Sequence, residues 1–231
     1  MVDYTIVERC PAYGFGKVFA VLKRAGHPWN HKRVYRVYCA LNLNLRLKGK
    51  KRLPSRNPEP LVVPADMNQC WSIDFMSDSL FCGRRFRTFN VVDDYNREAL
   101  AIEVDRSLPS VRVLERIMAW RGYPVKIRMA NGPEFISVTL ADWADKNDIQ
   151  LEFIKPGKPT QNSYVERFNR TYRTEVLNMY AFRRLSEVRE ITDNWIMEYN
   201  EERPHGSLGD LTPREYLTAN SNRENSKSSW S

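Results

Sequence analysis

The sequence predicts an α/β fold in which helices flank a mixed five-stranded sheet, preceded by a small helix-turn-helix-like segment. Three successive segments beginning at WSIDFMS alternate apolar and polar residues, which is the period of β-strands. Helical and strand patterns then alternate, as in sheets that carry helices on their faces. The N-terminal segment combines apolar residues at helical spacing with many basic residues.

Length and composition fit one well-packed domain with a smaller appendage. The chain has 231 residues, of which 42% are hydrophobic and 12% aromatic. The longest apolar runs are too short to span a membrane, and the N-terminus lacks the pattern of a signal peptide. Four scattered cysteines without a Cys-x-x-Cys pair indicate reduced thiols. We therefore expect a cytoplasmic protein that has no contact with a membrane.

Positive charge is concentrated near the N-terminus. The net charge is +8, but residues 1–58 contain 13 lysines and arginines against two acids, so the remainder is slightly negative. A basic segment beside a near-neutral body is typical of proteins that bind nucleic acid. A solvated basic linker has the same composition, and charge alone does not separate the two.

The N-terminal segment predicts two short helices. Val18 and Leu22 lie at helical spacing, Gly26 fits the end of the first helix, and Asn30 is a good N-cap for the second. Two short helices with a glycine in the turn and a basic second helix are typical of a helix-turn-helix. Three basic residues are expected to point outward from the second helix and contact DNA: Lys32, Arg33 and Arg36. Val34, Tyr35, Val37, Tyr38 and Leu41 are expected to point largely inward.

A zinc site in this segment is not expected. His27, His31 and Cys39 are near one another in sequence, but their spacing matches no standard cluster. A histidine in a turn and an exposed histidine on a helix are the simpler interpretation.

Composition divides the chain into four parts. Six basic residues between Arg46 and Arg56, together with several prolines, indicate an extended linker that follows the helical segment. The expected parts are a helix-turn-helix-like DNA-binding segment at 1–45, a basic proline-rich linker at 46–65, a second domain at 66–220 and a disordered tail at 221–231. Trp71, Trp120, Trp143 and Trp195 are expected in the core.

The second domain is expected to begin with three strands in a meander. These strands are WSIDFMS, RFRTFNVVDDYN and ALAIEVD. The elements expected after them are a helix from Pro109 to Trp120, the strand VKIRM, a helix over Ser137–Lys146, the strand LEFI, a long helix over Ser163–Tyr180, a helix from Ser186 to Asn200 and a short helix at TPREYL.

Asp74 is the acid that most needs an explanation. It lies in the middle of a strand between large apolar residues, where an unpaired carboxylate costs several kcal/mol. Its candidate partners lie at the end of the fourth strand, at position 130, and on the long helix, at Glu166, with 35 residues between these two positions. Asp93 and Asp94 could also neutralise the site, although they fit a turn equally well.

Several motifs occur in order along the chain: WSIDFM, VVDDYNRE, NGPEF, GKPTQNSYVERFNRTYRTE and EYNEERPHGSL. Together they resemble the integrase core of bacterial insertion-sequence transposases, which are relatives of retroviral integrase. The resemblance runs from about Tyr13 to Leu217, and the order of the motifs makes it more specific than any one of them. It implies a ribonuclease-H-like fold and an Asp, Asp, Glu triad that holds two Mg²⁺ or Mn²⁺ ions. By this resemblance Asp74 is the first acid and Glu166 is the third.

The chain departs from the family pattern at the second acid. RMANG has Ala130 where the family has an acid before Asn-Gly. Magnesium prefers oxygen ligands, and a pair of ions activates the attacking hydroxyl and stabilises the leaving oxygen of a phosphoryl transfer. Because alanine offers no oxygen, we expect the rate to fall by at least about a hundredfold. The alanine was either introduced to trap a complex or belongs to a decayed copy of an element.

Four further residues near Glu166 are candidates for contacts with DNA phosphates or terminal bases. They are Lys158, Gln161, Asn162 and Arg170. Asn162, Glu166 and Arg170 are four residues apart and so lie on one helix face. The spacing alone favours an asparagine cap with a solvated Glu–Arg pair, and the family resemblance reverses this preference.

The sequence thus predicts a transposase of integrase type that cleaves and transfers DNA strands by two-metal phosphoryl transfer and is impaired by Ala130. The alternatives are a non-catalytic DNA-binding protein derived from a transposase and a ribonuclease-H-type nuclease that acts on hybrids. The expected partners are the terminal repeats of an element, target DNA, further copies of the chain and an upstream-encoded transposase subunit. The expected location is the bacterial nucleoid.

Overall fold

The computed structural model describes residues 2–44, 61–132, 135, 138–155 and 159–228. The chain forms two compact units. The first contains residues 1–57 with 204–210, and the second contains residues 58–203 with 211–231.

The described N-terminal part of the first unit, residues 2–44, contains the helices α1 (Val2–Arg9), α2 (Phe15–Arg24) and α3 (His31–Ala40). The two helices expected from the sequence are α2 and α3, and α1 was not anticipated. Their apolar faces share one small core made of Tyr13, Val18, Leu22, Val34 and Tyr38. The helix-turn-helix-like pattern predicted from the sequence is therefore present.

The turn between α2 and α3 follows the sequence signals. Gly26 has a φ of 82°, which favours glycine, and the amide of His27 donates to the carbonyl of Leu22 at 3.2 Å, which closes α2. Asn30 caps α3 by accepting a hydrogen bond from the amide of Lys32 at 2.8 Å. Two residues expected to point inward are exposed instead, because Tyr35 is 48% and Val37 39% accessible to solvent.

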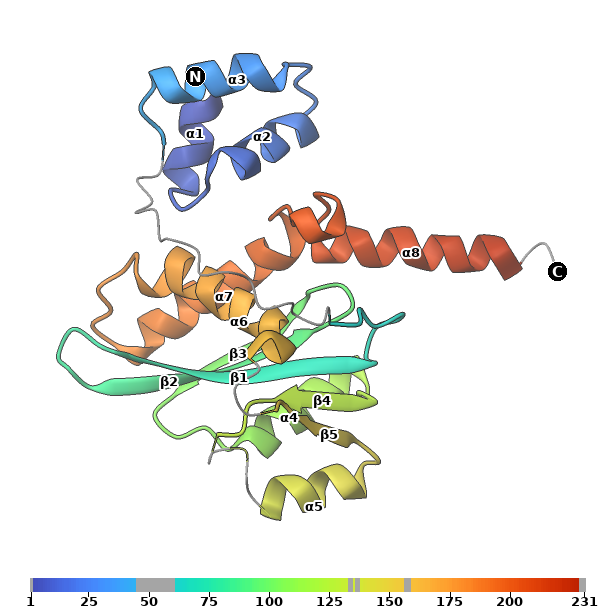
Figure 1. Cartoon of the computed structure of the whole chain (residues 1–231). Coiled ribbons are helices and arrows are strands. Elements are labelled where there is room, and N and C mark those ends of the chain that lie inside the picture. Colours follow the sequence, from blue (N-terminus) through green and yellow to red (C-terminus); the bar gives the residue numbers. More distant parts are fainter. Residues whose placement is uncertain (1, 45–60, 133–134, 136–137, 156–158, 229–231) are drawn as a thin grey trace. The chain divides into compact units, whose positions relative to one another are not determined.

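A mixed five-stranded sheet forms the centre of the second unit (Figure 1). Its strands are β1 (Cys70–Ser79), β2 (Arg85–Asp93), β3 (Ala99–Asp105), β4 (Lys126–Met129) and β5 (Gln150–Phe153). The strand order is β3-β2-β1-β4-β5, with β1, β2 and β3 antiparallel and β4 and β5 parallel to β1. This confirms the predicted fold class, a meander of three strands that is extended by two parallel strands.

Helices cover both faces of the sheet (Figure 1). One core lies between the sheet and α4 with α5, and the other lies between the sheet and α6 with α7. The helical elements that follow β3 are α4 (Ser110–Arg121), α5 (Val138–Lys146), η1 (Pro159–Asn162), α6 (Ser163–Tyr172), the π-helical turn η2 (Arg173–Leu177), α7 (Leu185–Glu201), η3 (Gly206–Leu208) and α8 (Pro213–Ser228).

Successive residues of β1 point to opposite faces of the sheet. Trp71 and Ile73 belong to the core under α4 and α5, whereas Met76 and Leu80 belong to the core under α6 and α7. Asp74 therefore lies on the face covered by α6, because it shares the even positions of the strand.

Three parts of the second unit differ from the sequence expectations. The long helix ends in the π-helical turn at Leu177 rather than near Tyr180. Trp120, expected in the core, is 59% exposed because the buried face of α4 ends at Met118. A disordered tail was expected at 221–231, but α8 continues to Ser228, since no proline or glycine interrupts the segment after Pro213.

No helix in the described part of the chain is long and apolar enough to cross a membrane.

Candidate active site

Asp74 is held by a short chain of carboxamides. It pairs with Asn90 across β1 and β2, so both side chains lie on the α6 face of the sheet. Asn169 of α6 donates its Nδ2 to Asp74 Oδ2 at 2.7 Å and accepts from Asn90 Nδ2 at 2.6 Å. Asn90 and Asn169 are buried, and they fix the orientation of the half-buried Asp74 carboxylate.

Position 130 is the next residue after β4 and lies beside Asp74. Met129 pairs with Ile73 in the parallel ladder, so the next residues on the two strands, Ala130 and Asp74, lie side by side in one row across the sheet. Neighbouring strands are about 4.8 Å apart, and residues in the same row point to the same face. Asn131 donates its Nδ2 to the carbonyl of Ile154 at 2.6 Å, which ties the start of the following loop to the end of β5. An acid at position 130 would therefore project next to Asp74.

Glu166 is carried over the same face by α6. It lies one helical turn before Asn169, and residues three apart on a helix point in similar directions. Burial raises the pKa of Glu166, whereas the charge of Arg170 lowers it. Helix α6 packs against β1 and β2, and its Asn169 contacts Asp74, so the helix that carries Glu166 crosses the face on which Asp74 lies.

The residues in this site make an incomplete set of metal ligands. In the described ranges no group of three His, Cys, Asp or Glu side chains is placed to hold a metal ion. The alanine at position 130 leaves the expected triad without its second acid. Two carboxylates remain, which is what one Mg²⁺ commonly takes from a protein.

The residues that flank Glu166 have different environments. Gln161 accepts a hydrogen bond from the amide of Lys155 at 2.8 Å and so connects η1 to the residues that follow β5. Asn162 is only 2% exposed, does not cap α6, and its Oδ1 has no partner among the described residues. Asn162 therefore does not form the helix cap that its spacing from Glu166 alone would favour. Arg170 is exposed, and Lys158 lies outside the described residues.

A buried ion pair lies two residues before Ala130 on the same face of the sheet. Arg128 Nη1 is 2.8 Å from Asp94 Oδ2, and Asp94 Oδ1 accepts from the Ser72 hydroxyl at 2.6 Å. Arg128 also lies 3.2 Å from Glu152 on β5. Asp94 therefore neutralises Arg128 and joins β2 to β4 through β1, rather than binding a metal with Asp74.

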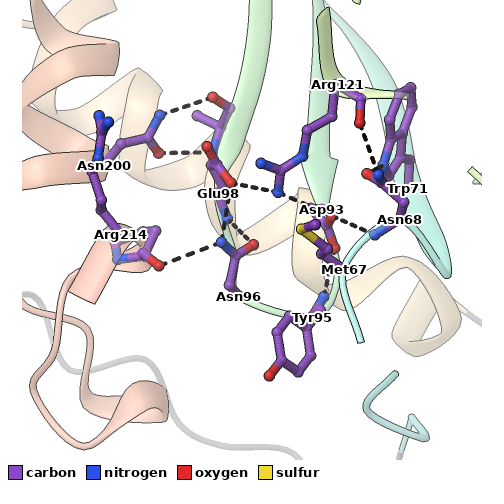
Figure 2. A network of polar contacts seen from close by, with 12 residues as sticks. Met67, Asn68, Trp71, Asp93, Tyr95, Asn96, Glu98, Arg121, Asn200 and Arg214 are labelled. Atoms are coloured by element: carbon purple, nitrogen blue, oxygen red, sulfur yellow. Dashed lines mark hydrogen bonds and ion pairs between the residues drawn. The ribbon is translucent and has the colours of Figure 1, made fainter. Parts of the chain in front are cut away.

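Asp93 belongs to a separate polar network at the end of β2 (Figure 2). It accepts hydrogen bonds from the backbone amides of Asn68 and Tyr95, each at 2.9 Å. Arg121 Nη2 lies 3.6 Å from Asp93 and 2.7 Å from Glu98, as ion pairs rather than aligned hydrogen bonds. These contacts close the turn between β2 and β3, so Asp93 has the turn role that was one of its two interpretations.

Asp93 should make the stability of the protein depend on pH. Burial raises the pKa of Asp93 to about 6, although its backbone hydrogen bonds and the charge of Arg121 oppose this shift. The unfolded carboxyl titrates at about pH 3.9, so the folded state keeps a proton that the unfolded chain has lost. This contribution to the free energy of unfolding falls as the pH rises from about 4 to about 6.

Asp93→Asn is expected to remove this dependence. The difference in melting temperature between the variant and the unaltered protein should grow by roughly 5–10 °C, in favour of the variant, as the pH is raised from 4 to 7. Circular dichroism follows both melting curves. A difference in melting temperature that stays constant over this range would contradict the assignment.

The basic residues expected to contact DNA in the first unit are exposed. Lys32, Arg33 and Arg36 all lie on α3, with Tyr35 between them. The second helix of a helix-turn-helix is the element that enters the major groove. The exposed face of α3 is therefore a surface of the kind that binds nucleic acid.

Known proteins share both parts of this arrangement. Residues 5–51 match the family model of an HTH-like domain, and residues 64–159 and 147–213 match two models of the integrase core domain. The chain is 41% identical over 207 residues to the insertion element IS407 uncharacterized 31.7 kDa protein of Burkholderia multivorans, covering 88% of this chain and 75% of that protein. It is 25% identical over 220 residues to the putative transposase InsK for insertion sequence element IS150 of Escherichia coli K12, covering 88% and 77% of the two chains.

A solved structure has the same fold. A chain of the simian T-cell lymphotropic virus intasome, solved in complex with PP2A regulatory subunit B56 gamma, superposes with a TM-score of 0.53 at 14% identity, covering 93% of this chain and 74% of that chain. The mixed sheet with helices on both faces, together with the matched family models, defines an integrase-type core domain. The chain belongs to the family of insertion-sequence transposases that join this core to an HTH-like domain.

The structure brings some of the predicted residues together and leaves others apart. Asp74, position 130 and the helix that carries Glu166 meet on one face of the sheet. Sequence reasoning missed Asn90 and Asn169, although each leaves a signal. Asn90 is a polar residue at a core-facing position of a strand, and Asn169 follows Glu166 by three residues.

Proposed function

We propose that this protein binds the terminal repeats of an insertion sequence and carries the site for cleaving and transferring DNA strands, with the chemistry suppressed by Ala130. Supporting this, Asp74 is held in a fixed orientation beside a position where an acid is missing. We assign DNA binding to residues 1–45, a linker to 46–65 and catalysis to 66–220. Such a protein would work at the nucleoid in the cytoplasm.

Asp74 and Glu166 are the residues that would hold a divalent cation. Two carboxylates with the Asn169 side-chain amide beside them fit one Mg²⁺ or Mn²⁺ ion. A two-metal site needs three acids, and the acid at position 130 is missing. When bound, such an ion supplies charge stabilisation for the reacting phosphate and lowers the pKa of a water or hydroxyl. Asn169 keeps Asp74 turned toward the ligand, and Arg170 carries positive charge at the same helix face.

Further copies of the chain, target DNA and an upstream-encoded subunit are the other proposed partners. The two ends of an element have to be brought together for transfer, which requires at least two protein molecules or a second subunit. Lys158, Gln161, Asn162 and Arg170 precede or share the helix of Glu166, so this helix face is the proposed contact with the terminal nucleotides.

The experiment that tests DNA recognition compares two double variants of the full chain. Arg33→Ala with Arg36→Ala changes α3, and Arg112→Ala with Lys146→Ala removes the same charge from exposed positions of α4 and α5. We expect the α3 variant to weaken binding to a labelled terminal-repeat duplex and to lower the slope of log K against log salt by about 0.9 per lost phosphate contact. Equal binding by the two variants would remove α3 from the proposal.

A further inference from the structure

A basic pocket lies at the far end of the β1–β2 hairpin. It has a volume of about 460 Å³ and is lined by Ser77, Asp78, Ser79, Arg85, Phe86, Arg87 and Arg106. The first six residues come from the paired ends of β1 and β2, and Arg106 follows the last residue of β3. The two strands run past the end of β4 to a turn at the left of the view (Figure 1).

The pocket carries a surplus of positive charge. Its lining holds three arginines against one acid, and that acid, Asp78, is already paired with Arg173 at 3.1 Å. Arg85 and Arg106 are exposed, and neither side chain forms an ion pair within the described part of the chain. Arg87 stacks on the ring of Phe75 at 4.4 Å, which holds one cation in place. The excess is local, because the chain after residue 58 is slightly acidic as a whole.

The chemistry of the lining suits phosphate groups. Guanidinium groups are weakly hydrated and donate two parallel hydrogen bonds to phosphate oxygens. The exposed Ser77 and Ser79 add hydroxyl donors on the same wall. Arg85 and Arg106, which have no acidic partner in the described part of the chain, and the stacked Arg87 leave guanidinium donors available to an anionic ligand.

The pocket is close to the candidate active site. Ser77 follows Asp74 by three residues, which is roughly 10 Å along a strand. The Arg87 guanidinium stacks on the ring of Phe75, the residue after Asp74. The pocket residues at odd positions of β1 face away from α6, whereas Asp74 faces α6. A polymer that contacts both the pocket and Asp74 would therefore cross the edge of β1 beyond the end of β4.

We propose that this pocket binds the backbone phosphates of the DNA whose reacting phosphate lies at Asp74. The proposal rests on the proposed function and adds a further DNA contact in the catalytic unit, separate from α3 and from the helix face of Glu166. Since the contacts are to phosphates, this binding does not depend on DNA sequence.

The test compares Arg85→Ala with Arg106→Ala, combined in the full chain, against the Arg112→Ala and Lys146→Ala control. All four side chains are exposed, so both proteins should fold, which equal melting temperatures would verify. Fluorescence anisotropy measures binding to terminal-repeat and unrelated duplexes over a range of salt. We expect the pocket variant to lower the salt slope by about 1.8 for both duplexes, corresponding to two phosphate contacts, and the control to leave it nearly unchanged.

Three outcomes separate the hypotheses. A pocket variant with the same slope as the control would overturn this inference, while weakened binding by the α3 variant would leave the proposed function standing. An unaltered chain that binds neither duplex would overturn both. A pocket variant that loses affinity for labelled polyglutamate but not for DNA would assign the surface to an acidic protein and overturn the inference.

Discussion

Ala130→Asp is expected to raise strand cleavage at a terminal-repeat duplex from background by at least about a hundredfold in Mg²⁺ or Mn²⁺. The restored carboxylate would continue β4 into the row of Asp74, one strand spacing away, and would complete the acid triad with Glu166. The measurement is cleavage and joining of a labelled duplex by the unaltered chain and by the variant.

Two controls define what the aspartate does. Ala130→Asn matches its size but removes the charge, so it should restore much less activity. Glu166→Gln in the Ala130→Asp background should abolish the gain. Without a divalent cation, Ala130→Asp should lower the melting temperature, because it places a second negative charge beside Asp74. A rise in melting temperature without cation would contradict this placement.

If the Ala130→Asp variant does not cut DNA, the alternative function, DNA binding without catalysis, would be favoured. The protein would then be a DNA-binding relative that occupies element ends without turnover, and the α3 variant would be its decisive test. Cleavage of an RNA:DNA hybrid in preference to a duplex would instead support the nuclease of ribonuclease H type. The HTH-like domain argues against that activity, since it is suited to binding duplex DNA.

The succession of strands and helices along the chain could be predicted because it depends on local patterns. WSIDFMS and ALAIEVD alternate over whole strands, and Gly122 interrupts the chain where α4 ends. Asp74 could be singled out because a carboxylate between apolar residues is costly wherever the strand is placed.

The carboxamides around Asp74 could not be predicted in the same way. Asn90 and Asn169 are 79 residues apart and meet only because β2 lies beside β1 and α6 crosses both. One sequence does not give the register of two strands or the rotation of a helix. For the same reason Asp93 and Asp94, adjacent in sequence, could not be assigned to two different networks.

Arg128→Met is expected to lower the free energy of unfolding by about 3–5 kcal/mol at pH 7. Arg128 is buried, and its removal leaves Asp94 in the interior with the Ser72 hydroxyl and without its cation. Chemical denaturation followed by tryptophan fluorescence measures the loss. Arg214→Met, which removes an exposed pair with Glu201, is the matched control and should cost less than about 1 kcal/mol.

The loss caused by Arg128→Met should also depend on pH. Burial already raises the pKa of Asp94, against the hydrogen bond from Ser72 and the charge of Arg128, which lower it. Removing the cation raises this pKa further, so the variant takes up a proton at a higher pH than the unaltered protein. The stability gap should therefore shrink as the pH falls and the carboxyl becomes neutral. Adding Asp94→Asn to Arg128→Met should recover part of the loss at pH 7.

The difference in unfolding free energy between Arg128→Met and the unaltered protein could be independent of pH, or Asp94→Asn could fail to recover any of the lost stability. Either result would mean that Arg128 acts through packing alone. The distinction matters for the catalytic site because Arg128 lies two residues before position 130 on β4. If the ion pair anchors β4 to β1 and β2, its loss should also reduce the cleavage gained by Ala130→Asp, since the restored carboxylate would no longer be held in the row of Asp74.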